Sequence, residues 1–143
     1  MLLGPFGISR LAGGDAYNRP MTTGLILFAH GARDPRWAEP FERLRQKVAA
    51  ARPGMPVALA FLELMTPHLG TATAALVAQG CTSIRVVPIF LGQGGHVRQD
   101  LPRLIGEAQF RHPAVGFELT TAVGEDESVL SRIAEVCVGG LTD

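Results

Sequence analysis

Lysine, cysteine and long apolar runs are the features that this sequence has least of. Lysine occurs once, as Lys47, among 13 basic residues that are balanced by 13 acidic ones. Because nucleic-acid binders usually carry a basic excess, the neutral balance argues against a nucleic-acid partner. No apolar stretch approaches the ~20 residues that a membrane-spanning helix needs, so we expect no membrane association.

The two cysteines, Cys81 and Cys137, form neither a CxxC pair nor the spacing of a zinc ribbon. A disulfide framework is therefore not expected, and a reducing cytoplasm is the expected location. The composition is that of a folded protein, with 47% hydrophobic and 18% charged residues. A chain of 143 residues has the size of one domain.

The N-terminal segment differs from the rest of the chain. It is interrupted by Gly, Pro and Arg, it has no clear periodicity, and it lacks the features of a secretory signal. Met21 then opens the segment MTTGLILFAHG, which resembles a natural protein start. We therefore expect residues 1–22 to be a disordered N-terminal extension and residues 23–143 to form a single α/β domain.

Four apolar runs of strand length follow, at residues 24–29, 57–62, 84–91 and 115–120. Unbroken apolar runs are typical of strands that are buried on both faces, as in a parallel sheet. Helical patterns fill the intervals. In the first interval the apolar residues recur every three or four positions and share one helix face; they are Ala38, Phe41, Leu44, Val48 and Ala51.

The other helices are predicted from their end signals. Thr66 is a plausible N-cap with Pro67 in the first turn, and Gly80 suits the end of that helix. A third helix is expected to start near Asp100 and to end before Pro113, and a fourth spans residues 125–138. The order βαβαβαβα predicts an open parallel sheet of about four strands with helices on both faces.

Three polar residues follow three consecutive predicted strands. They are His30, Glu63 and His96, and 33 residues separate each from the next. One βα unit has about this length, so all three fall at the carboxyl edge of the sheet, where ligands bind in open α/β folds. Two imidazoles and a carboxylate suit a borderline divalent metal, and three protein ligands leave coordination positions open.

Structural roles for these residues are the alternative. A single histidine at a strand end is more often a packed or capping residue, and Glu63 could be a solvated strand end. It is the combination of the three that indicates a site. We expect His68 to be structural or to support the site from behind, and His112 to interact with the dipole at a helix end.

A glycine-rich loop, GQGGH, precedes His96. It contains no GK[ST], and Val97 interrupts a GxGxxG pattern, so a phosphate-binding loop is not indicated. We expect Gly92, Gly94 and Gly95 to provide backbone freedom and to let a flat ligand approach closely.

Three segments together resemble the short class II chelatases, the CbiX/SirB-type sirohydrochlorin chelatases. They are LILFAHGARDP, FLELMTPHL and VVPIFLGQGGHVRQDLP, and the resemblance covers roughly residues 24–138. It implies a flavodoxin-like, chelatase-like fold and insertion of Co²⁺ or Fe²⁺ into sirohydrochlorin in cobalamin or siroheme biosynthesis. It also implies a homodimer and assigns metal handling to His30, Glu63 and His96. The metal, Co²⁺, Fe²⁺ or Ni²⁺, is then a substrate, and no permanently bound cofactor is expected.

Sirohydrochlorin is rich in carboxylates, and four arginines near the predicted mouth could pair with them: Arg33, Arg36, Arg98 and Arg103. For substrate binding we select Arg33, Gly94, Gly95 and Arg98. Glu63 would either share the metal or accept a pyrrole proton. The main alternative function is a non-catalytic metal carrier with the same ligands; a metallohydrolase and a flavin- or nucleotide-binding module are weaker alternatives.

Overall fold

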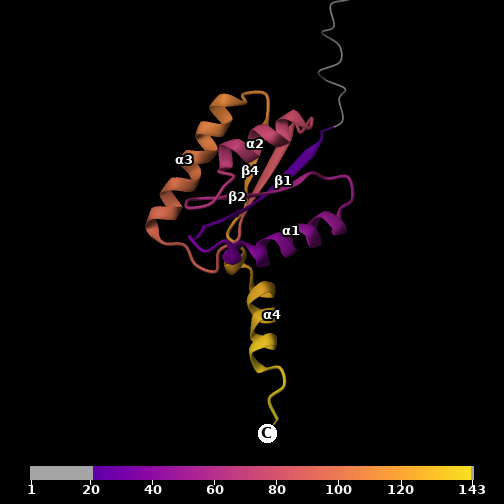
Figure 1. The fold of residues 1–143 in the computed structure, drawn as a ribbon, viewed down its shortest axis with the longest axis vertical. Coiled ribbons are helices and arrows are strands. Elements are labelled where there is room, and N and C mark those ends of the chain that lie inside the picture. The colour runs from indigo at the N-terminus through magenta and orange to yellow at the C-terminus, as the bar shows by residue number, and fades with distance from the viewer. Residues whose placement is uncertain (1–20, 143) are drawn as a thin grey trace, which may run out of the picture.

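The computed structural model describes residues 21–142 of the chain (Figure 1). Residues 1–20 of the expected extension lie outside the described residues. Thr22, which we had assigned to that extension, is held in place: its backbone N–H donates to Thr82 Oγ1 at 3.1 Å, and its carbonyl accepts from the Thr82 and Ser83 N–H groups. Thr22 therefore pairs with the backbone and side chain around Thr82, and the sheet itself begins at the next residue, Thr23.

Four parallel strands form one sheet in the order β2-β1-β3-β4. The strands are β1 (Thr23–Ala29), β2 (Val57–Phe61), β3 (Ser83–Pro88) and β4 (Gly116–Leu119). In the central register, Ile26 of β1 lies opposite Ala58 of β2 and Val86 of β3. The predicted strands and their parallel direction are confirmed.

Helices cover both faces of this sheet. Figure 1 shows α2 (Leu69–Ala78) and α3 (Gly95–Arg111) on one side and α1 (Glu39–Ala51) on the other. The buried core lies on the side of α2 and α3, where Ile26 and Phe28 of the sheet pack with Leu69, Leu76 and Leu101 of the helices. This arrangement leaves the carboxyl ends of the strands open at one edge, as a ligand site in this class of fold requires.

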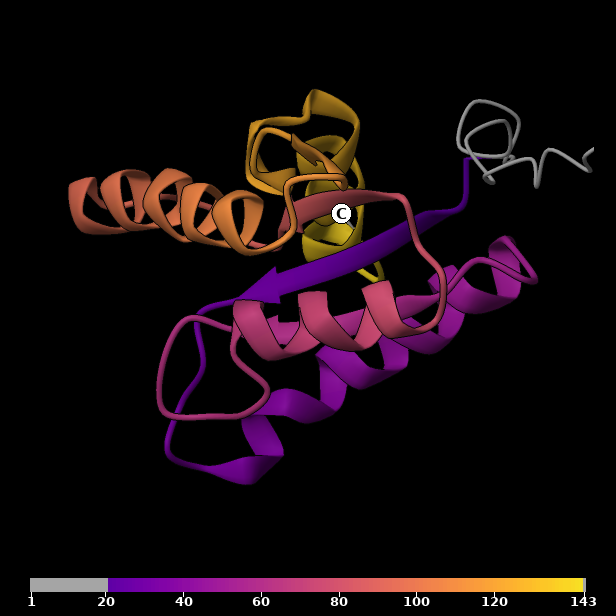
Figure 2. The ribbon, with the colours of Figure 1, turned by 90° about the horizontal axis from the view of Figure 1, so that it is seen from above.

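The last helix, α4 (Glu127–Val138), covers neither face. It follows the short 3-10 helix η2 (Val123–Glu125) and projects away from the body of the molecule (Figures 1 and 2). It has no buried residue, and the side chains of Leu130 and Ile133 are 40% and 39% exposed. The predicted helices on both faces of the sheet are therefore α1, α2 and α3, and α4 lies outside these layers.

The start of α2 was also predicted wrongly. Its N-cap is His68, not Thr66, and no side chain caps it. The Pro67 carbonyl accepts the Phe61 N–H at 2.9 Å, and Phe61 and His68 form an isolated parallel bridge. Pro67 and His68 thus pair with the end of β2, so the helix begins two residues later than Pro67. At its other end Gly80 adopts a φ of +93°, as expected of a helix stop.

Helix α3 begins five residues earlier than predicted, at Gly95, and Pro102 lies inside it. Gly94 is the N-cap, and its carbonyl accepts the Arg98 N–H at 3.2 Å. A proline inside a helix removes one backbone hydrogen bond and crowds the carbonyl four residues earlier, and Pro102 lies at an exposed position of α3. His96 therefore lies in the first turn of a helix and not in a loop.

A 3-10 turn, η1 (Pro35–Ala38), leads into α1, and Asp34 caps it by accepting the Arg36 N–H at 2.9 Å. The fourth helix begins two residues later than predicted, at Glu127, because Glu125 belongs to η2 and Asp126 is the N-cap. His112 is the C-cap residue of α3, in agreement with its predicted place at a helix end. Among the described residues, no helix combines the length and apolar character that crossing a bilayer requires.

Candidate functional site

His30 and Glu63 meet at the carboxyl edge of the sheet. Each residue lies just past the end of its strand, β1 or β2, and these strands are neighbours. The strand pairing continues through both residues, because the Glu63 N–H donates to the His30 carbonyl at 3.1 Å. Their side chains are also paired, with 2.9 Å between His30 Nε2 and Glu63 Oε1. Both remain open to solvent, at 45% and 52% exposure.

Gly31 explains how the two backbones come so close. Its φ is +95°, which side chains of L-residues rarely tolerate. A Cβ atom at this position would lie 1.8 Å from the Glu63 carbonyl oxygen. The His–Gly pair after the first strand therefore allows the turn on which the contact between His30 and Glu63 depends.

Phe90 lies beside the His30 ring and connects it to the core. The two rings are 6.5 Å apart and nearly perpendicular, and Phe90 also packs edge-on against Phe28 at 6.1 Å. The Phe90 carbonyl accepts the Gly124 N–H at 2.9 Å. The segment after β3 is thereby tied both to His30 and to η2, which leads into α4.

His96 is not in contact with this pair. It lies in the first turn of α3, where its Nε2 is 2.8 Å from Asp100 Oδ2, and its side chain is 82% exposed. Within residues 21–142, no three histidine, cysteine, aspartate or glutamate side chains converge as a metal-binding group. The structure thus brings together His30 and Glu63 and holds His96 in a second, separate histidine–carboxylate pair.

Asp100 is the residue that sequence reasoning missed at this site. The signal was the spacing of four between His96 and Asp100, which puts two residues on one face of a helix. That signal has meaning only if residue 96 is helical, and the helix was expected to start at Asp100 itself.

The four arginines divide into two groups. Arg36 forms an ion pair with Asp34, and its guanidinium is the main cause that lowers the pKa of that carboxyl. Arg103 pairs with Asp100 and Glu107. Within the described part of the chain, Arg33 and Arg98 are not in any ion pair, and both are exposed. Arg33 and Arg98 are therefore the two arginines of the four that remain available for a ligand.

The glycines of the GQGGH loop have ordinary roles in the backbone. Gly94 is the extended N-cap of α3, and Gly95 is its first residue. None of Gly92, Gly94 and Gly95 adopts a positive φ, and a Cβ at each would meet open space. The expected need for backbone freedom at these three positions is thus wrong.

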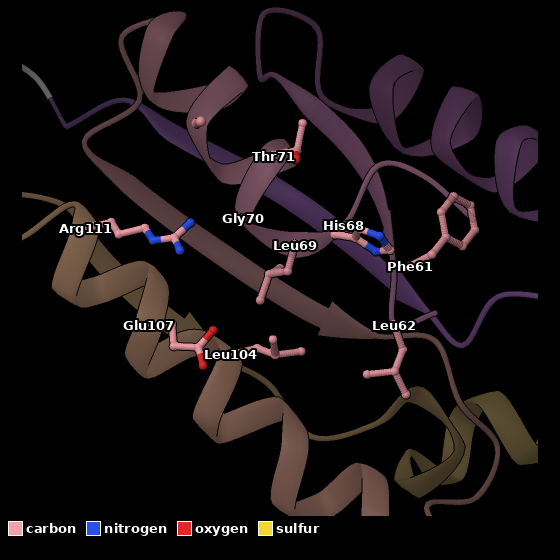
Figure 3. Close-up of a pocket in the computed structure, with 10 residues that line it drawn as sticks. Phe61, Leu62, His68, Leu69, Gly70, Thr71, Leu104, Glu107 and Arg111 are labelled. Carbon is pink, nitrogen blue, oxygen red and sulfur yellow. The ribbon is translucent and has the colours of Figure 1, made fainter. Parts of the chain in front are cut away.

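Two hollows meet at His68. One, of about 660 Å³, lies between α2 and α3 and is lined by Phe61, His68, Leu69, Leu104 and Arg111 (Figure 3). The other, of about 410 Å³, is lined by Arg33, Leu64, Met65 and His68. Neither includes His30, Glu63 or His96, which lie on the open edge. His68 itself is exposed and borders the site without touching the pair.

The fold and the site define a parallel α/β protein with a histidine–carboxylate pair at the carboxyl edge of its sheet, where ligands bind in this class of fold. The comparisons identify the family within it. The CbiX family model matches residues 24–137. The chain belongs to the CbiX family.

Its relatives are named for metal insertion into a tetrapyrrole. The chain is 33% identical over 121 residues to the sirohydrochlorin cobaltochelatase of Saccharolobus solfataricus, covering 80% of this chain and 90% of the relative. It is 31% identical over 120 residues to the sirohydrochlorin ferrochelatase of Bacillus subtilis, covering 79% of this chain and 43% of the relative. A crystal structure of a putative cobalamin biosynthesis CbiX protein from Marinobacter aquaeolei superposes with a TM-score of 0.73 at 33% identity, covering 80% and 93% of the two chains.

Proposed function

We propose that this protein is a sirohydrochlorin chelatase, a lyase that inserts Co²⁺ or Fe²⁺ into sirohydrochlorin in cobalamin or siroheme biosynthesis. The observation that carries the proposal is the pair formed by His30 and Glu63 at the carboxyl edge of a CbiX-family fold. The metal is a substrate that arrives, is transferred and leaves with the product.

Metal insertion requires a site that binds the ion without trapping it. In the proposal, His30 and His96 bind the metal through neutral imidazole nitrogens and displace some of its water. Both rings are open to solvent, so the aquated ion can reach them. Only the neutral ring has a nitrogen lone pair free to bind the metal.

Glu63 has the role of proton acceptor in the proposal. Its Oε1 is paired with His30, whereas within residues 21–142 its Oε2 has no hydrogen-bond partner. Two pyrrole N–H protons must leave the macrocycle as the metal enters, and a carboxylate oxygen at the metal edge can take one of them.

The variant Glu63→Gln tests this role. It keeps the shape and a hydrogen bond to His30 but cannot accept a proton. We expect insertion to fall ~10²–10⁴-fold, the usual contribution of general-base catalysis, while Co²⁺ affinity changes little. A parallel loss of Co²⁺ affinity would instead make Glu63 a metal ligand.

Arg33 and Arg98 recognise the substrate in the proposal. Sirohydrochlorin carries several carboxylates, and a free guanidinium binds a carboxylate through two parallel hydrogen bonds. Arg36 has an ion-pair partner in Asp34 and serves as the matched control. Arg33→Ala and Arg98→Ala should raise the KM for sirohydrochlorin several-fold with little change in kcat, and Arg36→Ala should leave both unchanged.

A metal carrier is the alternative function, and the names of the relatives favour the chelatase. Anaerobic mixing of the protein with Co²⁺ and sirohydrochlorin, followed by the absorbance of the macrocycle, separates the two. A chelatase accelerates the spectral change over a control without protein. A carrier binds Co²⁺ but leaves the rate of the change at the control value.

We further propose that the protein is a homodimer in the cytoplasm. The apolar side chains of α4 support the dimer, because Leu130 and Ile133 lie exposed on a helix that projects from the body (Figure 1). Exposed apolar stripes of this kind mark interaction surfaces. Light scattering should give twice the chain mass, and Ile133→Glu should give the monomer; a monomeric wild-type protein would refute the dimer.

The proposed cytoplasmic location is supported by the two cysteines. Cys81 and Cys137 are free thiols, which fit a reducing compartment.

A further inference from the structure

His96 and Asp100 form a pair whose geometry is set by the first turn of α3. The helix begins at Gly95, so residues 96 and 100 lie one turn apart on the same face. The distance from His96 Nε2 to Asp100 Oδ2 is 2.8 Å. At this distance the negative charge of the carboxylate favours a proton on Nε2, the ring nitrogen that faces it.

Asp100 is the better-fixed member of the pair. Its side chain is 19% exposed, against 82% for His96. Its other oxygen, Oδ1, lies 3.5 Å from Arg103 Nη2, and Arg103 Nη1 is in turn 2.8 Å from Glu107 Oε1. The carboxylate is thus held from the next turn of the helix and can hold an exposed ring in one orientation.

The contact also decides which nitrogen of His96 is free. A neutral imidazole carries one proton, and when Nε2 carries it toward the Asp100 carboxylate, Nδ1 keeps its lone pair. A similar arrangement is found at His30, where Nε2 is paired with Glu63 Oε1 at 2.9 Å. In both pairs a carboxylate faces Nε2, so Nδ1 is the nitrogen that keeps its lone pair.

We propose that Asp100 is a positioning residue for His96, which fixes the ring through Nε2 and presents Nδ1 to the incoming divalent metal. Partners of this kind orient metal-binding histidines and raise the basicity of the ring. The inference rests on the proposed function in one respect, namely that His96 is a residue that takes up the metal.

Binding of Co²⁺ alone, measured by titration without any tetrapyrrole, tests the proposal. Asp100→Ala should weaken Co²⁺ binding ~10–100-fold, the range found for the loss of such partners. Asp100→Asn should restore much of the affinity, because its side-chain oxygen can still face the Nε2 proton. In a His96→Ala background, Asp100→Ala should cause no further loss.

The matched control is Glu107→Ala. It removes a carboxylate from the same helix and from the same partner, Arg103, without touching His96. We expect its Co²⁺ affinity to stay within about two-fold of the wild type, as surface pairs of this kind contribute little. An equal loss in Glu107→Ala and Asp100→Ala would make the effect one of charge or helix stability and would overturn the proposal.

Two further outcomes separate this inference from the proposed function. If His96→Ala weakens Co²⁺ binding and Asp100→Ala does not, the positioning role is wrong and the chelatase proposal stands. If His96→Ala binds Co²⁺ as tightly as the wild type, the metal-binding role of His96 fails, and the positioning role fails with it. An Asp100→Asn variant as weak as Asp100→Ala would also overturn the proposal, because the contact between the side-chain oxygen and Nε2 would then not be the cause.

Discussion

Gly31 provides the sharpest test of how the edge of the sheet is built. In Gly31→Ala the new Cβ would lie 1.8 Å from the Glu63 carbonyl oxygen, whereas real contacts of a Cβ essentially never fall below 3.0 Å. The two backbones must therefore separate by at least 1.2 Å, which is 3.0 minus 1.8. The new alanine must also either keep a φ of +95°, which is unfavourable for a residue with a Cβ, or change the backbone conformation of the turn.

Two terms contribute to the expected loss of stability. A left-handed backbone costs an alanine about 1–2 kcal/mol, and forced overpacking costs typically about 1–3 kcal/mol more. We therefore expect a loss of ~2–5 kcal/mol in the free energy of unfolding. A displacement of the order of 1 Å at catalytic groups costs about 10²-fold in rate, so metal insertion should fall by about that factor.

Gly80→Ala is the matched control. Gly80 has nearly the same φ, +93°, but a Cβ there would meet nothing within 4 Å. It should lose only the backbone term, ~1–2 kcal/mol, and keep its activity. Urea denaturation of both variants gives the difference between them. Equal losses in the two variants would show that the close approach of Gly31 to Glu63 does not exist and would refute the reasoning.

Three further predictions concern the core, the thiols and α4. Leu76 is 1% exposed in the core, and Leu76→Ala should lower the free energy of unfolding by about 2–5 kcal/mol in urea denaturation. Burial raises the pKa of Cys81, whereas Cys137 is exposed, so a thiol reagent should titrate one thiol in the native protein and two in urea. Hydrogen bonds from Ser128 and from the first-turn backbone of α4 lower the pKa of Asp126 below its ordinary 3.8. The charged cap therefore stabilises α4 fully above that ordinary value and loses its effect as the pH falls through the lowered one, and circular dichroism should show acid fraying in the wild type that Asp126→Asn reduces.

The strands and the edge residues were predictable because their signals are local. Apolar runs of strand length fix β1 to β4, and equal spacing brings His30 and Glu63 to the same edge. The start of α2 was predicted wrongly because it depends on a contact outside the helix. Pro67 is drawn into pairing with Phe61 at the end of β2, and no pattern within the helix itself reveals this.

The position of α4 and the role of Asp100 could not be read from the sequence for related reasons. An amphipathic pattern predicts that α4 has an apolar face but does not say what that face contacts. The pairing of His96 with Asp100 depends on a helix that begins at Gly95, and the glycine-rich loop before it is typical of a break in structure.

The central claim is that the edge formed by His30 and Glu63 inserts a divalent metal into sirohydrochlorin. The most direct measurement is the anaerobic rate of Co²⁺ insertion into sirohydrochlorin, followed by macrocycle absorbance, for the wild type, His30→Ala and the matched edge variant His68→Ala. We predict acceleration by the wild type and His68→Ala that is lost in His30→Ala, with the fold of His30→Ala unchanged by circular dichroism. Insertion by a folded His30→Ala at the wild-type rate would contradict the account.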